Sequence, residues 1–330
     1  MADARRKKVL VAPLDWGLGH ATRCVPIIRE LLAREVDVVI ASSAGALKLL
    51  QQEFPQLPGV EIVSYKARYS SRWPFMIHLF FQLPWFLRAI AQEHKQINTI
   101  VSERGIDLII SDNRYGGWST QVPCVFITHQ VNIILPWYAS LAKPIVDFFN
   151  HRQIKKFTHC WVPDWPDGRL SKRLTRPTSL TIQFIGPLSR MKRPDAKTQK
   201  TLDVLALISG PEPRRTEFEL LLRQQLSTSW ALAKAIESAH IVIARSGYST
   251  IMDLIALQAT AILVPTPGQT EQEFLAEDLS QQGIAFFQHQ AEFDLKVALN
   301  SSKRYPGFAG WQMPANLLTD VVESTLEKLP

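Results

Sequence analysis

The sequence predicts an α/β fold built from two Rossmann-like domains in tandem. Short runs rich in β-branched residues alternate with helical patterns along the chain, which is typical of parallel sheets covered by helices. The alternation stops at residues 180–200, where a polar, basic run with prolines indicates a linker, and it resumes at residue 204. The 330 residues suffice for two domains, since one domain takes about 100–200 residues.

The first half of the chain has the pattern of a doubly wound sheet, because each apolar run is followed by a segment with helical spacing. The expected strands are 8–14, 36–42, 60–65, 106–112, 124–129 and 159–164, and the expected helices lie near 22–34, 44–53, 76–102 and 137–151. A further strand ends at Gly186 and Pro187.

The second half repeats the pattern on a smaller scale. We expect strands at 204–210, 240–246, 260–265 and 284–288, and helices from about 215, at 248–257 and at 270–281. The resulting division is 1–187 for the first domain, 188–200 for the linker, 201–310 for the second domain and 311–330 for a C-terminal helix. That last helix could pack on either domain.

Charge and cysteine content narrow the class of protein. A formal charge of +7 favours anionic partners such as a nucleotide-linked substrate or an acidic membrane surface. Nucleic acid is disfavoured, because the basic residues are dispersed and no nucleic-acid-binding module is present. Cys24, Cys124 and Cys160 form no metal-ligand spacing, and the N-terminus lacks a secretory pattern, so we expect free thiols, no metal and a cytoplasmic location.

The segment 73–91 is apolar and aromatic, and two interpretations of it stay open. Gln82, Pro84 and Arg88 interrupt it, whereas a membrane-spanning helix needs roughly 20 nearly unbroken apolar residues. It is either a buried helix pair or an amphipathic surface that contacts an anionic bilayer through residues 68–91, beside basic residues that include Arg68 and Arg72.

The first strand leads into the turn "LDWGLGHATR", residues 14–23. Gly17 and Gly19 permit close approach of a ligand to the backbone, and His20 follows at the start of a helix on the ligand side of the sheet. An imidazole there could act as a general base, with Asp15 close enough in sequence to orient it, or it could only cap the helix. Thr22 replaces the third glycine of a dinucleotide motif, which argues against a nicotinamide cofactor.

A second polar turn follows the strand at 106–112. Asp112, Asn113, Arg114 and Tyr115 precede two glycines, and the next strand is followed by His129 and Gln130. Such side chains at the carboxyl ends of parallel strands are typical of an acceptor or sugar site, although a plain solvated loop would have similar composition.

Two turns of the second domain have the composition of a phosphate site. Hydroxyl and amide donors at a helix start and nearby arginines favour a diphosphate, and a carboxylate suits ribose hydroxyls. The candidate donor-binding residues are Gly210, Arg214, Arg215, Arg245, Ser246, Gly247, Ser249, Thr250, Asp253, Gly268, Gln269 and Gln272.

Three stretches together resemble one family. "GLGHATR", "THQVN" and above all "RSGYSTIMDLIALQATAILVPTPGQTEQ" are similar to the two-domain inverting glycosyltransferases, of family 28 type, that include the peptidoglycan N-acetylglucosaminyltransferase. The resemblance implies a GT-B fold, with two domains facing a central cleft. It also implies that the second domain binds a UDP-sugar donor and that no cofactor takes part. The acceptor-binding site would lie on the first domain and include Gly17 and Gly19.

The resemblance also implies roles for single residues. His20 would be the general base, Ser246 and Gly247 would face the phosphates, Asp253 would bind the ribose and Gln272 would reach the donor sugar. The family usually has glutamate at the position of Asp253. Only 29 residues, 211–239, separate Gly210 from the next strand, so we expect a shortened second domain.

The function expected from these features is transfer of a sugar from a UDP-sugar to a hydroxyl of a lipid-linked or otherwise apolar acceptor. The enzyme would work in the cytoplasm or at the inner face of the cytoplasmic membrane. Two alternatives stay open. "GLGHATRC" also resembles the turn of UDP-sugar hydrolases of nonulosonic acid synthesis, in which water attacks, and the shortened second domain would suit a catalytically silent nucleotide-sugar-binding protein.

Overall fold

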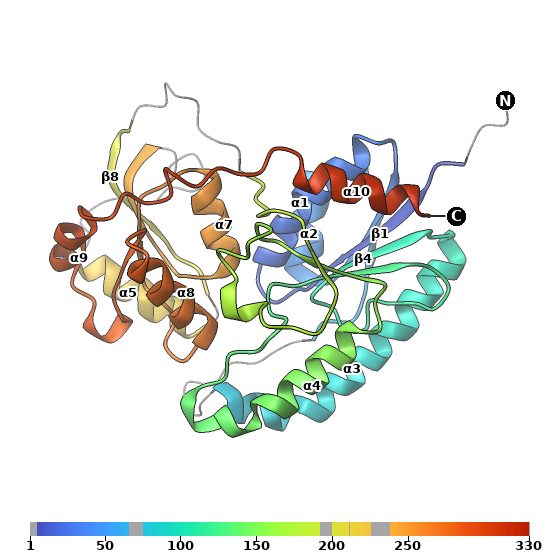
Figure 1. Cartoon of the computed structure of the whole chain (residues 1–330), viewed down its shortest axis with the longest axis horizontal. Coiled ribbons are helices and arrows are strands. Elements are labelled where there is room, and N and C mark those ends of the chain that lie inside the picture. The colour runs from blue at the N-terminus through green and yellow to red at the C-terminus, as the bar shows by residue number, and fades with distance from the viewer. Residues whose placement is uncertain (1–4, 66–74, 192–199, 211, 226–237, 330) are drawn as a thin grey trace. The chain divides into compact units, whose positions relative to one another are not determined.

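The structure is a computed structural model that describes residues 5–65, 75–191, 200–210, 212–225 and 238–329. The chain divides into two compact units (Figure 1). The first unit holds Met1–Ala67, Leu79–Arg190 and Pro314–Pro330, and the second is built mainly on Met191–Met313. The C-terminal helix therefore belongs to the first unit. Most of the expected linker, residues 192–199, lies outside the described residues.

The first unit contains a seven-stranded sheet in the order β3-β2-β1-β4-β5-β6-β7, in which every pair is parallel. Its strands are β1 Lys8–Pro13, β2 Asp37–Ser42, β3 Gly59–Glu61, β4 Leu108–Asp112, β5 Cys124–Ile127, β6 His159–Val162 and β7 Ile182–Phe184. The strands in the middle of the sheet are buried on both faces and mainly apolar, as parallel strands covered by helices require, although β4 ends in the buried polar residues Ser111 and Asp112.

Helices cover both faces of this sheet (Figure 1), and α1 shows how an apolar stripe packs against it. In α1, the buried side chains of Ala21, Cys24, Ile28 and Leu31 recur at helical spacing. The helices of this unit are α1 Gly19–Leu32, α2 Ala44–Glu53, α3 Phe75–Arg104, η1 Trp137–Ala142, α4 Lys143–Ile154, η2 Lys172–Leu174 and α10 Leu317–Glu327. Helix α10 lies beside α1 (Figure 1), and Lys7 Nζ donates to the backbone carbonyls of Leu326 and Leu329.

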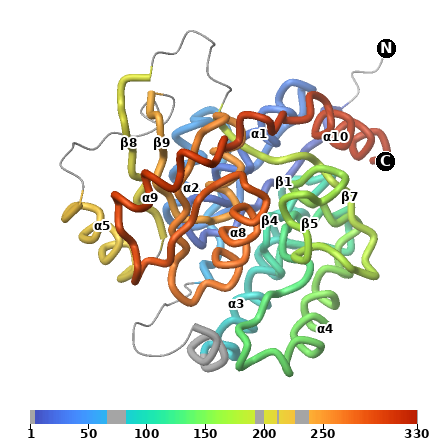
Figure 2. The backbone as a smooth tube through the Cα atoms, turned by 60° about the vertical axis from the view of Figure 1, so that its left-hand side comes forward, coloured from blue at the N-terminus to red at the C-terminus, as the bar shows by residue number. Residues whose placement is uncertain are grey.

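The second unit is smaller, with a four-stranded parallel sheet in the order β11-β10-β9-β8. Its elements are β8 Leu202–Leu207, α5 Arg214–Gln225, β9 Ala239–Ala244, α7 Tyr248–Ala256, β10 Ala261–Leu263, α8 Thr270–Gln281, β11 Phe286–Phe287, η3 Gln290–Glu292 and α9 Leu295–Ser302. Strands β8 and β9 pair directly (Figure 2), so the short segment between them adds no strand among the described residues. The predicted parallel α/β fold with a shortened second domain is confirmed.

The described residues of the segment 73–91 do not form a helix pair. Residues 75–91 belong to the single 30-residue helix α3, which contains Pro84, and residues 73 and 74 lie outside the described residues. In its described part, Phe86 and Ala89 are buried, whereas Leu83, Trp85 and Leu87 are exposed. No helix in the described parts of the chain is both long enough and apolar enough to cross a membrane.

Gly307 offers a test of the packing in the second unit. Its φ is +71°, and a Cβ there would lie 2.6 Å from the carbonyl oxygen of Ala259 and 2.7 Å from the Cα of Thr260. We expect Gly307→Ala to lower the free energy of unfolding by about 2–4 kcal/mol, because the left-handed backbone and the clash both penalise a side chain. Thermal and urea denaturation measure the change.

Gly310→Ala is the matched control, since a Cβ at Gly310 would meet no atom within 4 Å. Equal stability of the two variants would contradict the packing described for Gly307.

Candidate functional site

The polar turns of the first unit follow adjacent strands, so the parallel topology gathers them at the carboxyl edge of the sheet. After β1, the chain turns through Gly17 at a φ of +76°, which favours glycine. Helix α1 then begins at Gly19 and places His20 in its first turn. The side chain of His20 keeps 15% of its surface exposed.

His20 belongs to a cluster with Arg23, Asp112 and His129, which we call the His20 cluster. Asp112 is the last residue of β4, and its Oδ2 accepts from Nε of Arg23 at 2.6 Å, while Oδ1 contacts Nη2 of Arg23. His20 Nδ1 lies 3.2 Å from Oδ1 of Asp112 and 2.8 Å from Nη2 of Arg23. Nη1 of Arg23 lies 3.1 Å from Nδ1 of His129.

Burial and charge shift the titration of this cluster. Burial and the positive charge of Arg23 lower the pKa of His20, against the opposing effect of Asp112. Burial alone would raise the pKa of Asp112, but the charge of Arg23 and its hydrogen bonds outweigh burial and hold that pKa well below the usual range. These shifts favour a neutral imidazole and an ionised carboxylate, the net charges that a general base and its partner need.

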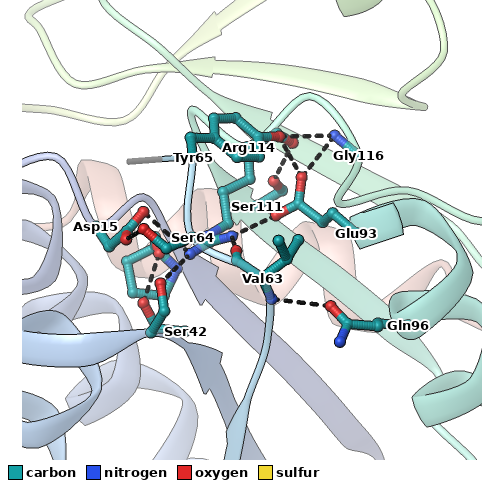
Figure 3. A network of polar contacts seen from close by, with 12 residues as sticks. Asp15, Ser42, Val63, Ser64, Tyr65, Glu93, Gln96, Ser111, Arg114 and Gly116 are labelled. Atoms are coloured by element: carbon teal, nitrogen blue, oxygen red, sulfur yellow. Dashed lines mark hydrogen bonds and ion pairs between the residues drawn. The ribbon is translucent and has the colours of Figure 1, made fainter. Parts of the chain in front are cut away.

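Asp15 does not orient His20, contrary to the expectation from sequence. Its carboxylate contacts the hydroxyl of Ser64 and lies 3.4 Å from Nη2 of Arg114 (Figure 3). The carboxylate beside His20 is Asp112, which β4 delivers next to β1. Proximity in sequence was misleading, because the tight turn at Gly17 directs Asp15 and His20 to different partners.

Arg114 is fully buried and organises a second network, drawn in Figure 3. Its Nη1 donates to Glu93 Oε1 at 2.5 Å and to the carbonyl of Val63, and its Nε donates to the carbonyl of Pro13. Tyr65 donates its hydroxyl to Glu93. These contacts join the loops after β1, β3 and β4 to α3, so Arg114, a candidate for acceptor binding, has a structural role here.

The other acceptor candidates lie on the same edge. Asn113 has a φ of +59°, and its backbone N–H donates to the carbonyl of Ile127. The hydroxyl of Tyr115 donates to Asn150 Oδ1 at 2.7 Å, and burial raises its pKa to about 12. Gln130 is half-buried, and its carbonyl accepts from the side chain of Asn150.

In the second unit, the turns after β8, β9 and β10 contact one another at the carboxyl edge. Ser246 Oγ donates to the carbonyl of Gln272 at 2.7 Å. The guanidinium of Arg245 is buried, where it donates to the carbonyls of Val264, Pro265 and Arg214 and lies over the ring of Phe218. Arg245 therefore ties these turns together, and burial lowers its pKa to about 10.

The turn after β10 contains a polar group that sequence reasoning missed. Thr266 is buried, and its hydroxyl has no hydrogen-bond partner within the described residues. A Cβ at Gly210, whose φ is +108°, would lie 3.8 Å from this hydroxyl. The side-chain amide of Gln272 accepts from the backbone N–H of Thr266 and donates to Gln269, so in this structure Gln272 shapes the turn.

The remaining donor candidates surround these turns. Gly247 precedes the first residue of α7, which carries Ser249, Thr250 and Asp253 in its first two turns. Arg214 and Arg215 begin α5 and form ion pairs with Glu217 and Glu212. Gly268 lies in an exposed turn with a φ of +80°. Among the described residues, no group of three or more His, Cys, Asp or Glu side chains could hold a metal ion.

Arg23 and Thr266 are the site residues that the sequence interpretation omitted. A signal for Arg23 was present, because residues three apart share a helix face, and a charged residue within the apolar stripe of α1 needs a buried partner. No comparable signal marked Thr266, since its burial depends on how neighbouring turns pack.

Most of the second unit is similar to a known domain family. Residues 211–301 match the glycosyltransferase family 28 C-terminal domain. The UDP-N-acetylglucosamine--N-acetylmuramyl-(pentapeptide) pyrophosphoryl-undecaprenol N-acetylglucosamine transferase of Methylorubrum extorquens (strain PA1) is 47% identical over 58 residues, which cover 17% of this chain and 16% of that enzyme. An uncharacterized glycosyltransferase of Methanosarcina mazei is 23% identical over 84% of this chain and 85% of its own length.

Solved structures extend the likeness to the whole fold. The glycotransferase of kitacinnamycin superposes with a TM-score of 0.64 at 15% identity, covering 99% of this chain and 100% of its own. MurG of Acinetobacter baumannii gives a TM-score of 0.59 at 14% identity, with coverages of 97% and 99%. The chain thus has a GT-B glycosyltransferase fold, and the resemblance inferred from the sequence is confirmed.

The ion pair of Arg23 and Asp112 leads to a prediction about stability and pH. Asp112→Asn should lower the free energy of unfolding at neutral pH by about 3–5 kcal/mol, because it leaves the charge of Arg23 buried without a partner. Since the folded-state pKa of Asp112 is lowered, its stabilisation is present above the usual aspartate pKa and is lost as the pH falls towards the lowered value. Urea denaturation of both proteins from pH 7 to pH 3 should show the difference shrinking.

Asp167→Asn serves as the control, because the ion pair of Asp167 with Arg169 is exposed, with 54% of the Asp167 side chain accessible. An exposed pair contributes less than about 1 kcal/mol. A wild-type advantage over Asp112→Asn that does not change with pH would contradict the lowered pKa.

Proposed function

Because residues 211–301 form a glycosyltransferase family 28 C-terminal domain within a GT-B fold, we propose that the protein transfers a sugar from a UDP-sugar to a hydroxyl of an apolar, lipid-linked acceptor. The observation that carries the proposal is this domain, together with the turns after β8, β9 and β10 that meet at one edge of its sheet. We also propose that the first domain ends at residue 187, the linker at residue 200 and the second domain at residue 310.

The second unit supports donor binding through backbone and hydroxyl groups. The first backbone N–H groups of α7 and the hydroxyls of Ser249 and Thr250 suit the phosphates, and helix N-termini favour anions. The unpartnered hydroxyl of Thr266 suits an oxygen of the same ligand. Asp253 would hold the ribose, and Arg214 and Arg215 would lie near the diphosphate.

The first unit supports proton removal from the acceptor. In the proposed reaction, the acceptor oxygen attacks the anomeric carbon, its proton moves to Nε2 of His20, and the bond from that carbon to the β-phosphate oxygen breaks. UDP leaves with the electron pair, and one displacement inverts the configuration. Asp112 stabilises the imidazolium that forms, since Oδ1 lies 3.2 Å from Nδ1.

The proposal predicts the effect of removing His20. His20→Gln should lower kcat for UDP release by about 10²–10⁴-fold, the usual contribution of a general base, while UDP binding measured by calorimetry stays unchanged. His240→Gln is the matched control, because His240 is exposed on β9, and this variant should keep wild-type activity.

The same assay separates the alternatives. Labelled UDP-sugars are incubated with and without acceptor lipid. Prompt release of free sugar without acceptor would identify a hydrolase, and UDP binding without turnover would identify a nucleotide-sugar-binding protein. Either result overturns the transferase proposal.

An exposed apolar surface in the first unit supports a lipid-linked acceptor and contact with an anionic membrane. We call it the α4 surface, and it consists of Trp137, Leu141, Ile145, Phe148 and Phe149, with 95% of Leu141 and 87% of Trp137 accessible. Ile145, Phe148 and Phe149 lie on α4 at helical spacing, which forms one apolar face, and Leu141 lies on the preceding helix η1.

Basic residues accompany this face. Lys143, Arg152, Lys155 and Lys156 are exposed, whereas Asp147 is the one acidic residue of the sequence between 130 and 160. Leu83, Trp85 and Leu87 on α3 are also exposed, in the described part of the segment 68–91 expected to contact a bilayer. Apolar side chains flanked by basic ones favour an anionic lipid surface.

Vesicle binding tests the α4 surface. The protein should cosediment with phosphatidylcholine vesicles that contain phosphatidylglycerol, and the double variant Leu141→Glu/Phe148→Glu should bind at least about tenfold more weakly, because two apolar side chains no longer insert. Leu220→Glu, at an exposed leucine of α5 in the second unit, is the control. Equal binding of all three proteins would contradict this role.

A further inference from the structure

We propose that Arg23 fixes the tautomer of His20, so that the unliganded protein holds the neutral imidazole with its proton on Nε2. The proposal rests on the proposed function for its catalytic meaning, because it states when His20 can act as the base. Arg23 is a positioning residue here, since it acts on the acceptor hydroxyl only through His20.

The contact between Arg23 and His20 determines which ring nitrogen carries the proton. Nδ1 of His20 lies 2.8 Å from Nη2 of Arg23 and 3.2 Å from Oδ1 of Asp112. A guanidinium has only N–H donors, so at the shorter contact Nδ1 must offer its lone pair. A neutral imidazole whose Nδ1 accepts carries its proton on Nε2.

Arg23 is held in this position from several sides. Its Nε donates to Oδ2 of Asp112 at 2.6 Å, its Nη2 also contacts Oδ1, and its Nη1 lies 3.1 Å from Nδ1 of His129. The side chain is 1% exposed. A planar guanidinium with partners at all three nitrogens cannot rotate away from His20 without breaking the buried ion pair.

The tautomer decides what His20 can do. With the proton on Nε2, that nitrogen is a hydrogen-bond donor and cannot take the proton of an acceptor hydroxyl. The basic form needs the proton on Nδ1, donated to Asp112, but two N–H groups would then face each other across 2.8 Å. Arg23 must therefore move away from Nδ1 before His20 can act as the base. The ring then loses the proton on Nε2 and gains one on Nδ1, so its net charge is unchanged.

The charged and titratable groups that face His20 come from three elements: Arg23 on α1, Asp112 on β4 and His129 after β5. The charge of Arg23 disfavours a second proton on His20, and that of Asp112 favours it. Removal of the Arg23 charge leaves Asp112 as the main charged neighbour, so the protonated imidazole becomes more favourable.

Nuclear magnetic resonance of the histidine rings tests the tautomer in the wild-type protein. The unliganded protein is labelled with ¹⁵N-histidine, and long-range ¹H–¹⁵N correlations identify the protonated nitrogen of each ring. His20→Gln assigns the His20 signals by their absence. We expect an unprotonated Nδ1 and a protonated Nε2, and a protonated Nδ1 in the neutral ring overturns the proposal.

The variant Arg23→Met tests the cause. The pKa of His20 should rise by about one unit or more, because the repelling charge is gone and Asp112 remains. Arg23→Lys keeps the charge and should keep the pKa of His20 low. If Arg23 only supported the fold, the pKa of His20 would not depend on the charge at this position. An unchanged His20 pKa in Arg23→Met overturns the proposal, and if that variant does not fold, the wild-type tautomer decides.

These spectra need no substrate, so their outcome is separate from that of the proposed function. Absence of sugar transfer would reject the transferase and leave the assignment of Arg23 intact. A protonated Nδ1 would reject the role of Arg23 and leave His20 as an unrestrained base.

Discussion

The ion pair between Arg23 and Asp112 is the interaction on which the candidate catalytic site depends. Both side chains are buried, and a buried charge is costly unless its partner and further hydrogen bonds compensate it. Asp112 uses both oxygens on Arg23, and Arg23 also contacts Nδ1 of His20 and Nδ1 of His129. His20 Nδ1 thus lies beside both members of a compensated buried ion pair.

Parallel topology explains why residues far apart in sequence meet here. The order of the larger sheet places β1 between β2 and β4, so the loop after β1 lies between two other loops at the carboxyl edge. Arg114 connects these loops by donating to the carbonyls of Pro13 and Val63 and to Glu93 on α3. This second buried cation holds the loop before α1 in place, and the first turn of α1 then presents His20.

Periodicity was enough to predict the strands and most helices, because parallel strands and amphipathic helices have distinct apolar patterns. Side-chain partners were harder to predict. Sequence distance favours Asp15 as the partner of His20, yet Asp112, 92 positions away, is the neighbour of His20. Residue type alone does not indicate that Arg245 is buried and donates to the carbonyls of Val264 and Pro265. Such pairings depend on which loops lie next to each other, and one strand's pattern does not contain that information.

The two units use buried arginines in different ways. In the first unit, Arg23 and Arg114 are compensated by carboxylates, so their charges are internal to the fold. In the second unit, Arg245 is bound to carbonyl oxygens and to the side chain of Gln290, and none of the ion pairs among the described residues includes it. Its positive charge therefore persists beneath the turns that carry Thr266 and Ser246. In the proposed function, a donor phosphate bound at those turns would experience this charge at low dielectric, in addition to that of the exposed arginines.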